Sequence, residues 1–387
     1  MTDRPAQIPS AVAHDEIARG LLAIELSRAS WIVASLAPTS DKISLHKLQA
    51  GDVAALLELI ARQRTRLSAA LGRPVDMVCC YEAGYDGFWL HRRLEAEGVR
   101  CLVFDPASLQ VNRRARRAKT DRIDAHALLR ALMAHLRGEP RVVSLVRVPS
   151  PEQEDARRLH RERDQLVGER VRHVNRIKGL LATQGIYDYQ PLRRDRVQRL
   201  EGLQTGDGRP LPARLKAELE RELRRLELVL EMLAGIEAER DALLEQPAPA
   251  HPHAEKIQAL AKLKGIGPEF ASVLVGEVFY RDFDNRRQLA SYVGLAPSPF
   301  CSGRMQQDQG ISKAGNAKAR RSLIELSWMW LRHQSDSALS GWFRERVGGL
   351  KGRVRRIALV ALARKLLIAL WRYLSTGLLP SGAVLKG

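Results

Sequence analysis

The sequence predicts an α/β domain at the N-terminal end, then a long helical region, then a mainly α-helical C-terminal domain. Short runs rich in Ile, Val and Leu alternate with helical patterns over residues 21–137, as in α/β domains. Leucines then recur at alternating spacings of four and three over residues 219–233, which is a coiled-coil pattern. From residue 254 onward, helical patterns separated by turns replace the strand-like runs.

The α/β domain is expected over residues 21–150, after a loose tail over residues 1–20. Three strand-like runs come first, and helices and strands alternate after them. The expected elements, in order, are strands 21–27, 30–37 and 43–49, helix 52–71, strand 75–83, helix 87–98, strand 99–106 and helix 120–137. Short turns favour antiparallel pairing of the first three strands, and helical crossovers favour parallel pairing of the later ones. This order is the ribonuclease H-like arrangement of a mixed sheet.

The middle of the chain, residues 151–245, is expected to form two long helices. The first has residues at intervals of seven, namely Leu159, Leu166, His173 and Leu180. The second has the alternating series Leu219, Leu223, Leu226, Leu230 and Leu233. The pattern fits either an antiparallel helical hairpin or part of a dimer interface. Residues 246–253 contain three prolines and are expected to be a linker, in which His251 and His253 are not metal ligands.

The chain is strongly basic, with 63 Lys and Arg against 44 Asp and Glu and a net charge of +19. Such an excess attracts polyanions, of which nucleic acid is the commonest and an anionic membrane the other candidate. The most apolar stretch, residues 357–374, contains three basic residues, so it is expected to pack in a core and not to span a membrane. The N-terminal residues lack the apolar core of a signal peptide, and the four cysteines have no metal-finger spacing. These features predict a cytoplasmic protein that binds polyanions and no membrane.

Four acidic residues stand where a mixed sheet would bring them together. Glu25 interrupts an apolar strand, Glu82 ends the central strand, and Asp121 and Asp124 begin the helix after the last strand. Strand ends of a doubly wound sheet converge on one edge, where gathered carboxylates would repel each other without a divalent cation. Mg²⁺ suits such oxygen ligands, and a pair of ions can stabilise both oxygens of a phosphoryl displacement. Alternatively, the aspartates only favour the helix dipole behind the N-cap Thr120, and Glu82 only closes a turn.

A basic run precedes the two aspartates. Its cations are Arg113, Arg114, Arg116, Arg117 and Lys119. Beside a metal site, such a run is where a phosphate backbone is expected to lie; the alternative is a solvated charged loop.

The C-terminal domain, expected over residues 254–387, contains two turn-rich segments. Lys264, Gly265 and Gly267 lie in a Lys-Gly-Ile-Gly-Pro segment between two helical patterns. This segment is similar to a helix-hairpin-helix, whose glycines expose backbone N–H groups to a phosphate. An ordinary turn between helices is the alternative.

The second turn-rich segment holds a candidate nucleophile. Ser302 precedes Gly303 in an expected loop that also carries the basic residues Arg304 and Lys313. A serine becomes nucleophilic only when a base or a metal activates it, and no histidine is near in sequence. Activation would therefore come from the carboxylate site, from another part of the protein or from another subunit. A Ser-Gly pair that serves only as a turn is the alternative.

Taken together, these motifs resemble the IS110 family of insertion-sequence transposases over nearly the whole chain. The family has a strand acid near its start, an acid before a small residue and glycine, and a Lys-Thr-Asp-x-x-Asp-Ala signature, which match Glu25, Glu82 and residues 119–125 here. Its C-terminal half has a Gly-Ile-Gly-Pro turn, a Ser-Gly pair and a Gly-x-Ile-Ser-Lys-x-Gly-Asn motif, which match residues 265–268, 302–303 and 310–316.

The resemblance implies a RuvC-like domain that binds Mg²⁺ through the four acids, and a Ser302 that forms a covalent phosphoserine link with DNA. It also implies double-stranded DNA at the element ends and target, a structured guide RNA from the element, and a homodimer or homotetramer, in a nucleoid-associated prokaryotic protein. One departure is Glu25, where the family usually has aspartate; the longer side chain still offers two oxygens. Two alternatives remain: a RuvC-like nuclease that uses metal-activated water, and a nucleic-acid-binding protein without catalysis.

Overall fold

The computed structural model describes residues 18–109, 120–140, 142–245, 253–302 and 305–386, with the side chains of residues 299–309 left out. The chain divides into two compact units, Met1–Pro149 and Ser150–Gly387. Each unit has its own hydrophobic core, and each is described separately below.

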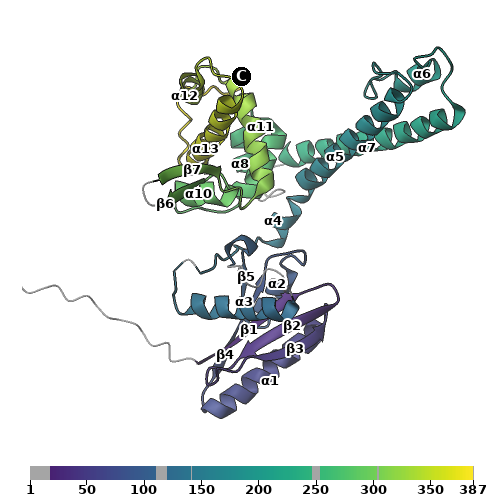
Figure 1. The fold of residues 1–387 in the computed structure, drawn as a ribbon. Helices are drawn as coiled ribbons and strands as arrows, with labels where there is room; N and C mark the ends of the chain where they lie inside the picture. The colour runs from purple at the N-terminus through teal and green to yellow at the C-terminus, as the bar shows by residue number, and fades with distance from the viewer. Residues whose placement is uncertain (1–17, 110–119, 141, 246–252, 303–304, 387) are drawn as a thin grey trace, which may run out of the picture. The chain divides into compact units, whose positions relative to one another are not determined.

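The N-terminal unit is built on a five-stranded mixed sheet with the order β3-β2-β1-β4-β5 (Figure 1). Strands β1, β2 and β3 pair antiparallel, and β4 and β5 continue the sheet in parallel. The elements are β1 (Ala18–Leu26), β2 (Ser30–Leu36), β3 (Ser44–Gln49), α1 (Val53–Leu71), β4 (Val75–Glu82), α2 (Trp89–Ala96), β5 (Arg100–Phe104), η1 (Pro106–Ser108) and α3 (Asp121–Leu136). The predicted ribonuclease H-like arrangement is confirmed.

Helices cover both faces of this sheet. Because side chains alternate along a strand, Leu22 and Ile24 of β1 pack on the face covered by α1 and α2. Ala23 of β1 and Cys80 of β4 pack on the opposite face, which α3 covers through residues such as Leu128. A site at the strand ends on the second face therefore lies beside α3.

Strand β1 begins earlier than expected. Residues 18–20, which the sequence placed in a loose tail, belong to β1 because they pair in parallel with the start of β4, Ala18 opposite Val75. Glycine fits at position 20 because a Cβ there would lie 2.7 Å from Met77 Sδ, which is closer than van der Waals contact allows. The earlier residues of the expected tail lie outside the described residues.

The C-terminal unit begins with a helical hairpin (Figure 1). Its elements are α4 (Pro151–Asp155), α5 (Arg158–Ala182), α6 (Arg196–Glu201) and α7 (Ala213–Glu245). Helices α5 and α7 pack against each other within one chain, which favours the first of the two interpretations of the coiled-coil pattern. The predicted seam of α7 is buried except at Leu230, which is half-buried.

On α5 the predicted seam is only partly right. Leu166 is buried, but Ile177 and Leu181 fill the core where Leu180 was expected. His173 instead contacts Glu222, with Nδ1 at 2.7 Å from Oε2. A straight helix turns once in 3.6 residues, so a series spaced by seven drifts off the contact face.

The remaining helices form a separate core around α11 and α13. The elements are α8 (Ala254–Ala261), α9 (Pro268–Leu274), the π-helical turn η3 (Val275–Phe279), α10 (Arg286–Val293), β6 (Pro297–Ser302), β7 (Met305–Ile311), α11 (Ala317–His333), α12 (Ala338–Val347) and α13 (Arg353–Thr376). The apolar face of α13 is buried, as predicted for core packing. In the part of the chain that the structure describes, no helix is long and apolar enough to cross a membrane.

Candidate active site

Two of the four predicted carboxylates lie side by side on adjacent strands. Parallel pairing sets Ile24 opposite Tyr81, and Glu25 and Glu82 are the next residues along β1 and β4. Strand alternation turns both toward the face that α3 covers, because Ala23 and Cys80 pack on that face. Glu25 is half-buried and Glu82 is exposed.

The other two carboxylates belong to the first turn of α3. Asp121 and Asp124 are seven and four residues before Leu128, which is buried against the sheet, so the three share one side of the helix. Thr120 caps α3 by accepting a hydrogen bond from the Ile123 N–H at 3.4 Å. The cap uses the threonine hydroxyl and leaves the two aspartates for other contacts. All four carboxylates thus belong to the same face of the sheet.

The carboxylates do not come together as a finished metal site. Among the described residues, no group of three or more His, Cys, Asp and Glu is close enough to hold a metal ion. The donor set itself suits a hard divalent cation, since it offers only carboxylate oxygens. The expected basic run, residues 113–119, lies outside the described residues.

Ser302 lies at the tip of a β-hairpin and not in a loop. Strand β6 ends at Ser302, and its backbone pairs with Met305, the first residue of β7. The sequence did not predict these strands, because Pro297 and Pro299 and the polar run of β7 show no strand-like alternation. Arg304 lies outside the described residues.

Close backbone contacts hold the base of this hairpin. A Cβ on Gly294 would lie 1.9 Å from the Ala314 carbonyl oxygen, and one on Gly315 would lie 2.2 Å from the Tyr292 oxygen. The Ser312 N–H also donates to the Ala296 oxygen at 2.8 Å. A side chain at Gly294 or Gly315 would therefore collide with the backbone of the neighbouring segment. Lys313 is exposed and has a positive φ of 58°, which is uncommon for a residue with a side chain.

The Gly-Ile-Gly-Pro segment is a tightly packed turn. Gly265 has a φ of +88°, and a Cβ there would lie 2.9 Å from His333 Cβ of α11. The Lys264 N–H donates to the Val384 oxygen at 3.0 Å, while the lysine side chain is exposed. Gly267 precedes the short α9 without a side-chain cap. These contacts explain the turn structurally, and nucleic-acid binding by it stays a prediction.

Comparison with known proteins decides the family. Residues 257–340 match the model of the Transposase IS116/IS110/IS902 family, and residues 32–185 match the DEDD transposase model of IS110 elements. A putative transposase, y4rJ of Sinorhizobium fredii, is 51% identical over 399 residues, covering 99% of this chain and 98% of that protein. The chain belongs to the IS110 family of transposases. A DEDD transposase domain implies a metal-dependent active site.

More distant relatives agree with this assignment. A probable family 20 transposase of Pseudomonas aeruginosa is 33% identical over 66% of this transposase and 73% of its own length. The transposase for insertion sequence element IS1111A of Coxiella burnetii is 30% identical over 66% of this chain and 67% of its own. The DEDD match starts at residue 32, so it does not include Glu25.

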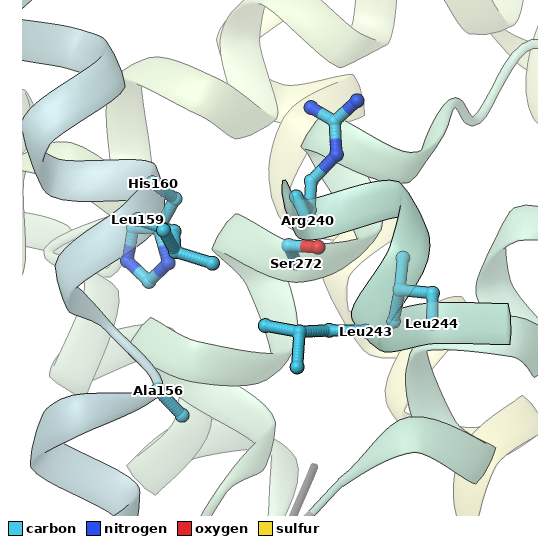
Figure 2. Close-up of a pocket in the computed structure, with 7 residues that line it drawn as sticks. All are labelled: Ala156, Leu159, His160, Arg240, Leu243, Leu244 and Ser272. Atoms are coloured by element: carbon cyan, nitrogen blue, oxygen red, sulfur yellow. The ribbon is translucent and has the colours of Figure 1, made fainter. Parts of the chain in front are cut away.

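A small cavity of the transposase lies beside α5, α7 and α9 (Figure 2). Its lining residues are Ala156, Leu159, His160, Arg240, Leu243, Leu244 and Ser272. The volume is about 20 Å³, which is room for about one water molecule. This cavity is therefore too small for a nucleotide and is not a substrate site.

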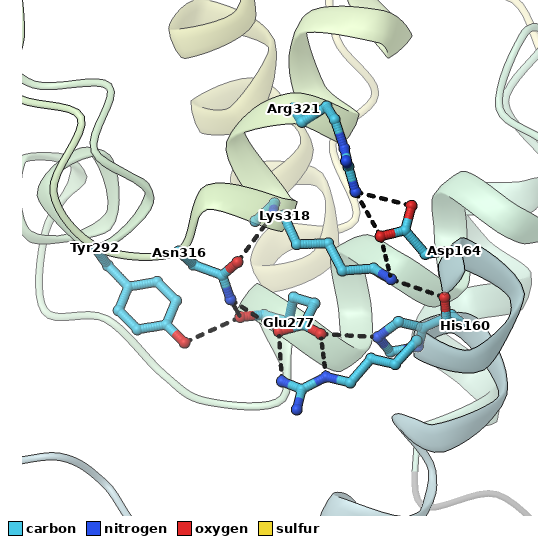
Figure 3. A network of polar contacts seen from close by, with 9 residues as sticks. His160, Asp164, Glu277, Tyr292, Asn316, Lys318 and Arg321 are labelled. Carbon is cyan, nitrogen blue, oxygen red and sulfur yellow. Dashed lines mark hydrogen bonds and ion pairs between the residues drawn. The ribbon is translucent and has the colours of Figure 1, made fainter. Parts of the chain in front are cut away.

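A buried acid of the transposase, Glu277, was not predicted from the sequence. Glu277 lies in η3, and its side chain is 2% exposed. His160 Nε2 lies 2.9 Å from Glu277 Oε1, and Arg161 Nε donates to the same oxygen at 2.8 Å (Figure 3). Burial alone would raise the pKa of Glu277, but hydrogen bonds with His160 and Arg161 outweigh it and hold the pKa well below its usual range. Glu277 thus stabilises the fold at neutral pH, and this contribution is lost as the pH falls below the usual glutamate pKa. Glu277 stands within an apolar run of the sequence, as Glu25 does. The pattern that predicted a role for Glu25 could therefore have predicted one for Glu277.

A second missed feature is an exposed basic surface at the turn between α12 and α13, which we call the α12–α13 corner. Its cations are Arg344, Arg346, Lys351, Arg353, Arg355 and Arg356, all exposed. Glu345 is the one acid among residues 344–356. Arg355 lies over the ring of the partly exposed Trp328, 5.0 Å from its centroid. None of these cations forms an ion pair with any described residue, whereas Arg193 and Arg209 are paired with Asp195 and Asp207.

We expect the α12–α13 corner to contact nucleic-acid phosphates. Replacing Lys351, Arg353 and Arg356 with glutamine should lower the slope of log K against log salt by about 0.9 for each lost contact. Binding to duplex DNA, measured by fluorescence anisotropy over a salt series, checks this. The control variant replaces the ion-paired Arg193 and Arg209 with glutamine. Equal slopes in the triple variant and the wild type would show that the α12–α13 corner does not contact the phosphate backbone of the DNA.

Proposed function

We propose that the transposase cuts and rejoins DNA through a covalent phosphoserine intermediate at Ser302, assisted by Mg²⁺ at Glu25, Glu82, Asp121 and Asp124. The observation that carries this proposal is the placement of the acids. Glu25 is the last residue but one of β1 and Glu82 is the last residue of the adjacent parallel strand β4, and both lie on the face of the sheet that α3 covers. The family membership supports it, because a DEDD domain implies a metal-dependent site. Ser302 is supported by its place at the end of β6, in the segment that matches the transposase family.

The proposed step exchanges one phosphoester bond for another. Ser302 Oγ forms a bond to a DNA phosphorus, and one P–O bond of the strand breaks. The serine proton passes to a base, and the released deoxyribose oxygen takes up a proton. Attack by the hydroxyl of another DNA end on the phosphoserine reverses these changes, so that strands are rejoined without an external energy source.

The four acids would hold the cation, or a pair of cations, through carboxylate oxygens. When bound, Mg²⁺ neutralises these charges and stabilises the attacking and leaving oxygens of a phosphoryl displacement. Glu25 is one methylene longer than the usual aspartate of the family, and its side chain is half-buried on β1. Oxygen ligands tolerate such a change where coordination is adaptable.

The proposed partners are double-stranded DNA at the element ends and target, a structured guide RNA from the element, and further copies of this chain as a homodimer or homotetramer. The net charge of +19 supports both nucleic acids, because DNA and RNA present the same phosphates to Lys and Arg. The α5–α7 hairpin leaves Leu228 and Met232 about half exposed, at 52% and 46%, which supports a contact between copies.

A covalent-adduct assay tests the proposal. Wild-type protein is incubated with labelled element-end DNA, flank RNA and Mg²⁺, then denatured, and the labelled peptide is identified by mass spectrometry. We expect label on the peptide that contains Ser302, and none when a chelator is present. Cleaved DNA with free ends and no adduct would favour the metal-activated water nuclease. Binding without any cleavage would favour a non-catalytic nucleic-acid-binding protein.

A further inference from the structure

Both ends of the β6–β7 hairpin are attached to one buried residue, Glu277 (Figure 3). Tyr292 of α10, before the hairpin, donates its hydroxyl to the Glu277 backbone oxygen at 3.0 Å. Asn316, after the hairpin, donates from Nδ2 to Glu277 Oε2 at 2.8 Å. The Asn316 N–H also donates to the Tyr292 oxygen at 2.9 Å. The two residues that flank the hairpin are thus bonded to each other and to Glu277.

The other side of Glu277 is bonded to the start of α5. Arg161 reaches both carboxylate oxygens, at 2.8 Å and 3.1 Å, and the His160 ring lies at 2.9 Å. Gly276 permits this approach, because a Cβ there would come within 2.7 Å of the His160 ring. Glu277 is therefore the common partner of α5 and of the hairpin base.

A neighbouring ion pair joins α5 to α11 without touching the hairpin base. Arg321 Nη2 lies 2.6 Å from Asp164 Oδ2, and both side chains are about half exposed. This pair belongs to the same polar region in Figure 3, so it provides a matched control for effects that come only from the packing of α5.

The hairpin depends on its base for its position. Among the described residues, its two strands pair only with each other, and a two-stranded hairpin is marginally stable on its own. A displacement of about 1 Å at a reacting group can cost a factor of about 10² in rate. Loss of the bonds at the base is therefore expected to disturb the tip, where β6 ends at Ser302.

We propose that Glu277 is a positioning residue for Ser302, which anchors the base of the β6–β7 hairpin to the first turn of α5. The inference rests on the proposed function, in which Ser302 is the nucleophile. Glu277 itself does not touch DNA in this proposal; it acts through Tyr292 and Asn316.

The test variant is Asn316→Asp. Asparagine caps α11 by accepting from the Ala319 N–H at 3.0 Å, and aspartate keeps that cap while removing the donor to Glu277 and placing a like charge beside it. We expect amide hydrogen exchange within residues 297–311 to quicken by about tenfold or more. The rate of adduct formation at saturating DNA should fall by about 10², with an unchanged Kd for DNA.

The controls separate positioning from general packing. Arg321→Gln should leave both the exchange of the hairpin amides and the adduct rate close to the wild type. The double variant Glu277→Gln with Asn316→Asp restores an amide-to-carboxylate bond between these two side chains and keeps a single negative charge on the pair. Arg161 then has one acceptor oxygen in place of two, so the double variant should recover only part of the adduct rate.

Two results would overturn the inference: hairpin exchange in Asn316→Asp that equals the wild type, or Arg321→Gln that disturbs the hairpin equally. Failure of the proposed function has a different outcome. In that case Ser302→Ala would still cleave DNA, while Asn316→Asp would still quicken exchange of the hairpin amides.

Discussion

Strand joining by the transposase is expected to be lost when Ser302 is replaced by alanine. The change removes a single hydroxyl, and loss of a covalent nucleophile costs on the order of 10⁴-fold or more in rate. The protein–DNA adduct should vanish together with the joined product, while DNA binding stays. The measurement is the rate of product formation from labelled element-end DNA with flank RNA and Mg²⁺, followed in a denaturing gel.

A serine on the same strand is the matched control. Ser298 also belongs to β6 but lies away from the tip of the hairpin. Ser298→Ala therefore removes a serine hydroxyl from the same strand without changing Ser302. We expect this variant to join strands within a few-fold of the wild-type rate. Cleavage that survives in Ser302→Ala without an adduct would assign the chemistry to water and refute the serine mechanism.

The second large effect is expected at the carboxylates. Glu82→Gln and Asp121→Asn remove one negative charge each without changing size, and loss of one electrostatic group at a reacting centre costs about 10²- to 10³-fold in rate. The Mg²⁺ concentration that gives half-maximal cleavage should rise as well, because the cation loses a charged ligand. Glu25→Asp restores the family's usual residue and should keep or increase the rate.

Asp76 offers a control at the opposite end of the same strand. It is exposed and six residues before Glu82 on β4, so alternation places it on the same face but away from the proposed site. Asp76→Asn should leave the rate and the Mg²⁺ dependence unchanged. If Glu82→Gln and Asp121→Asn behave like Asp76→Asn, the metal-site proposal is wrong.

Much of the N-terminal fold could be predicted because its signals are local. Alternating apolar residues in β1 and β4 and the spacing of Leu56, Ile60 and Leu67 in α1 reflect the faces that each element buries. The same reasoning picked out Glu25, since an acid within an apolar strand has no local explanation. The structure agrees in placing Glu25 beside Glu82 in the sheet register, and the role of both residues in catalysis stays a prediction.

The sequence by itself determined the order of strands and helices in the N-terminal unit, the packed face of α13, and which strand or helix carries each of the four acids, because each depends on the pattern within one element. Only the tertiary structure decided that α5 and α7 pair within one chain, that β6 and β7 form a hairpin with Ser302 at its tip, and that Glu277 anchors its base. The Glu277–His160 contact joins residues 117 positions apart. Contacts of that kind arise when separate elements pack together, and no periodicity within a single element encodes them.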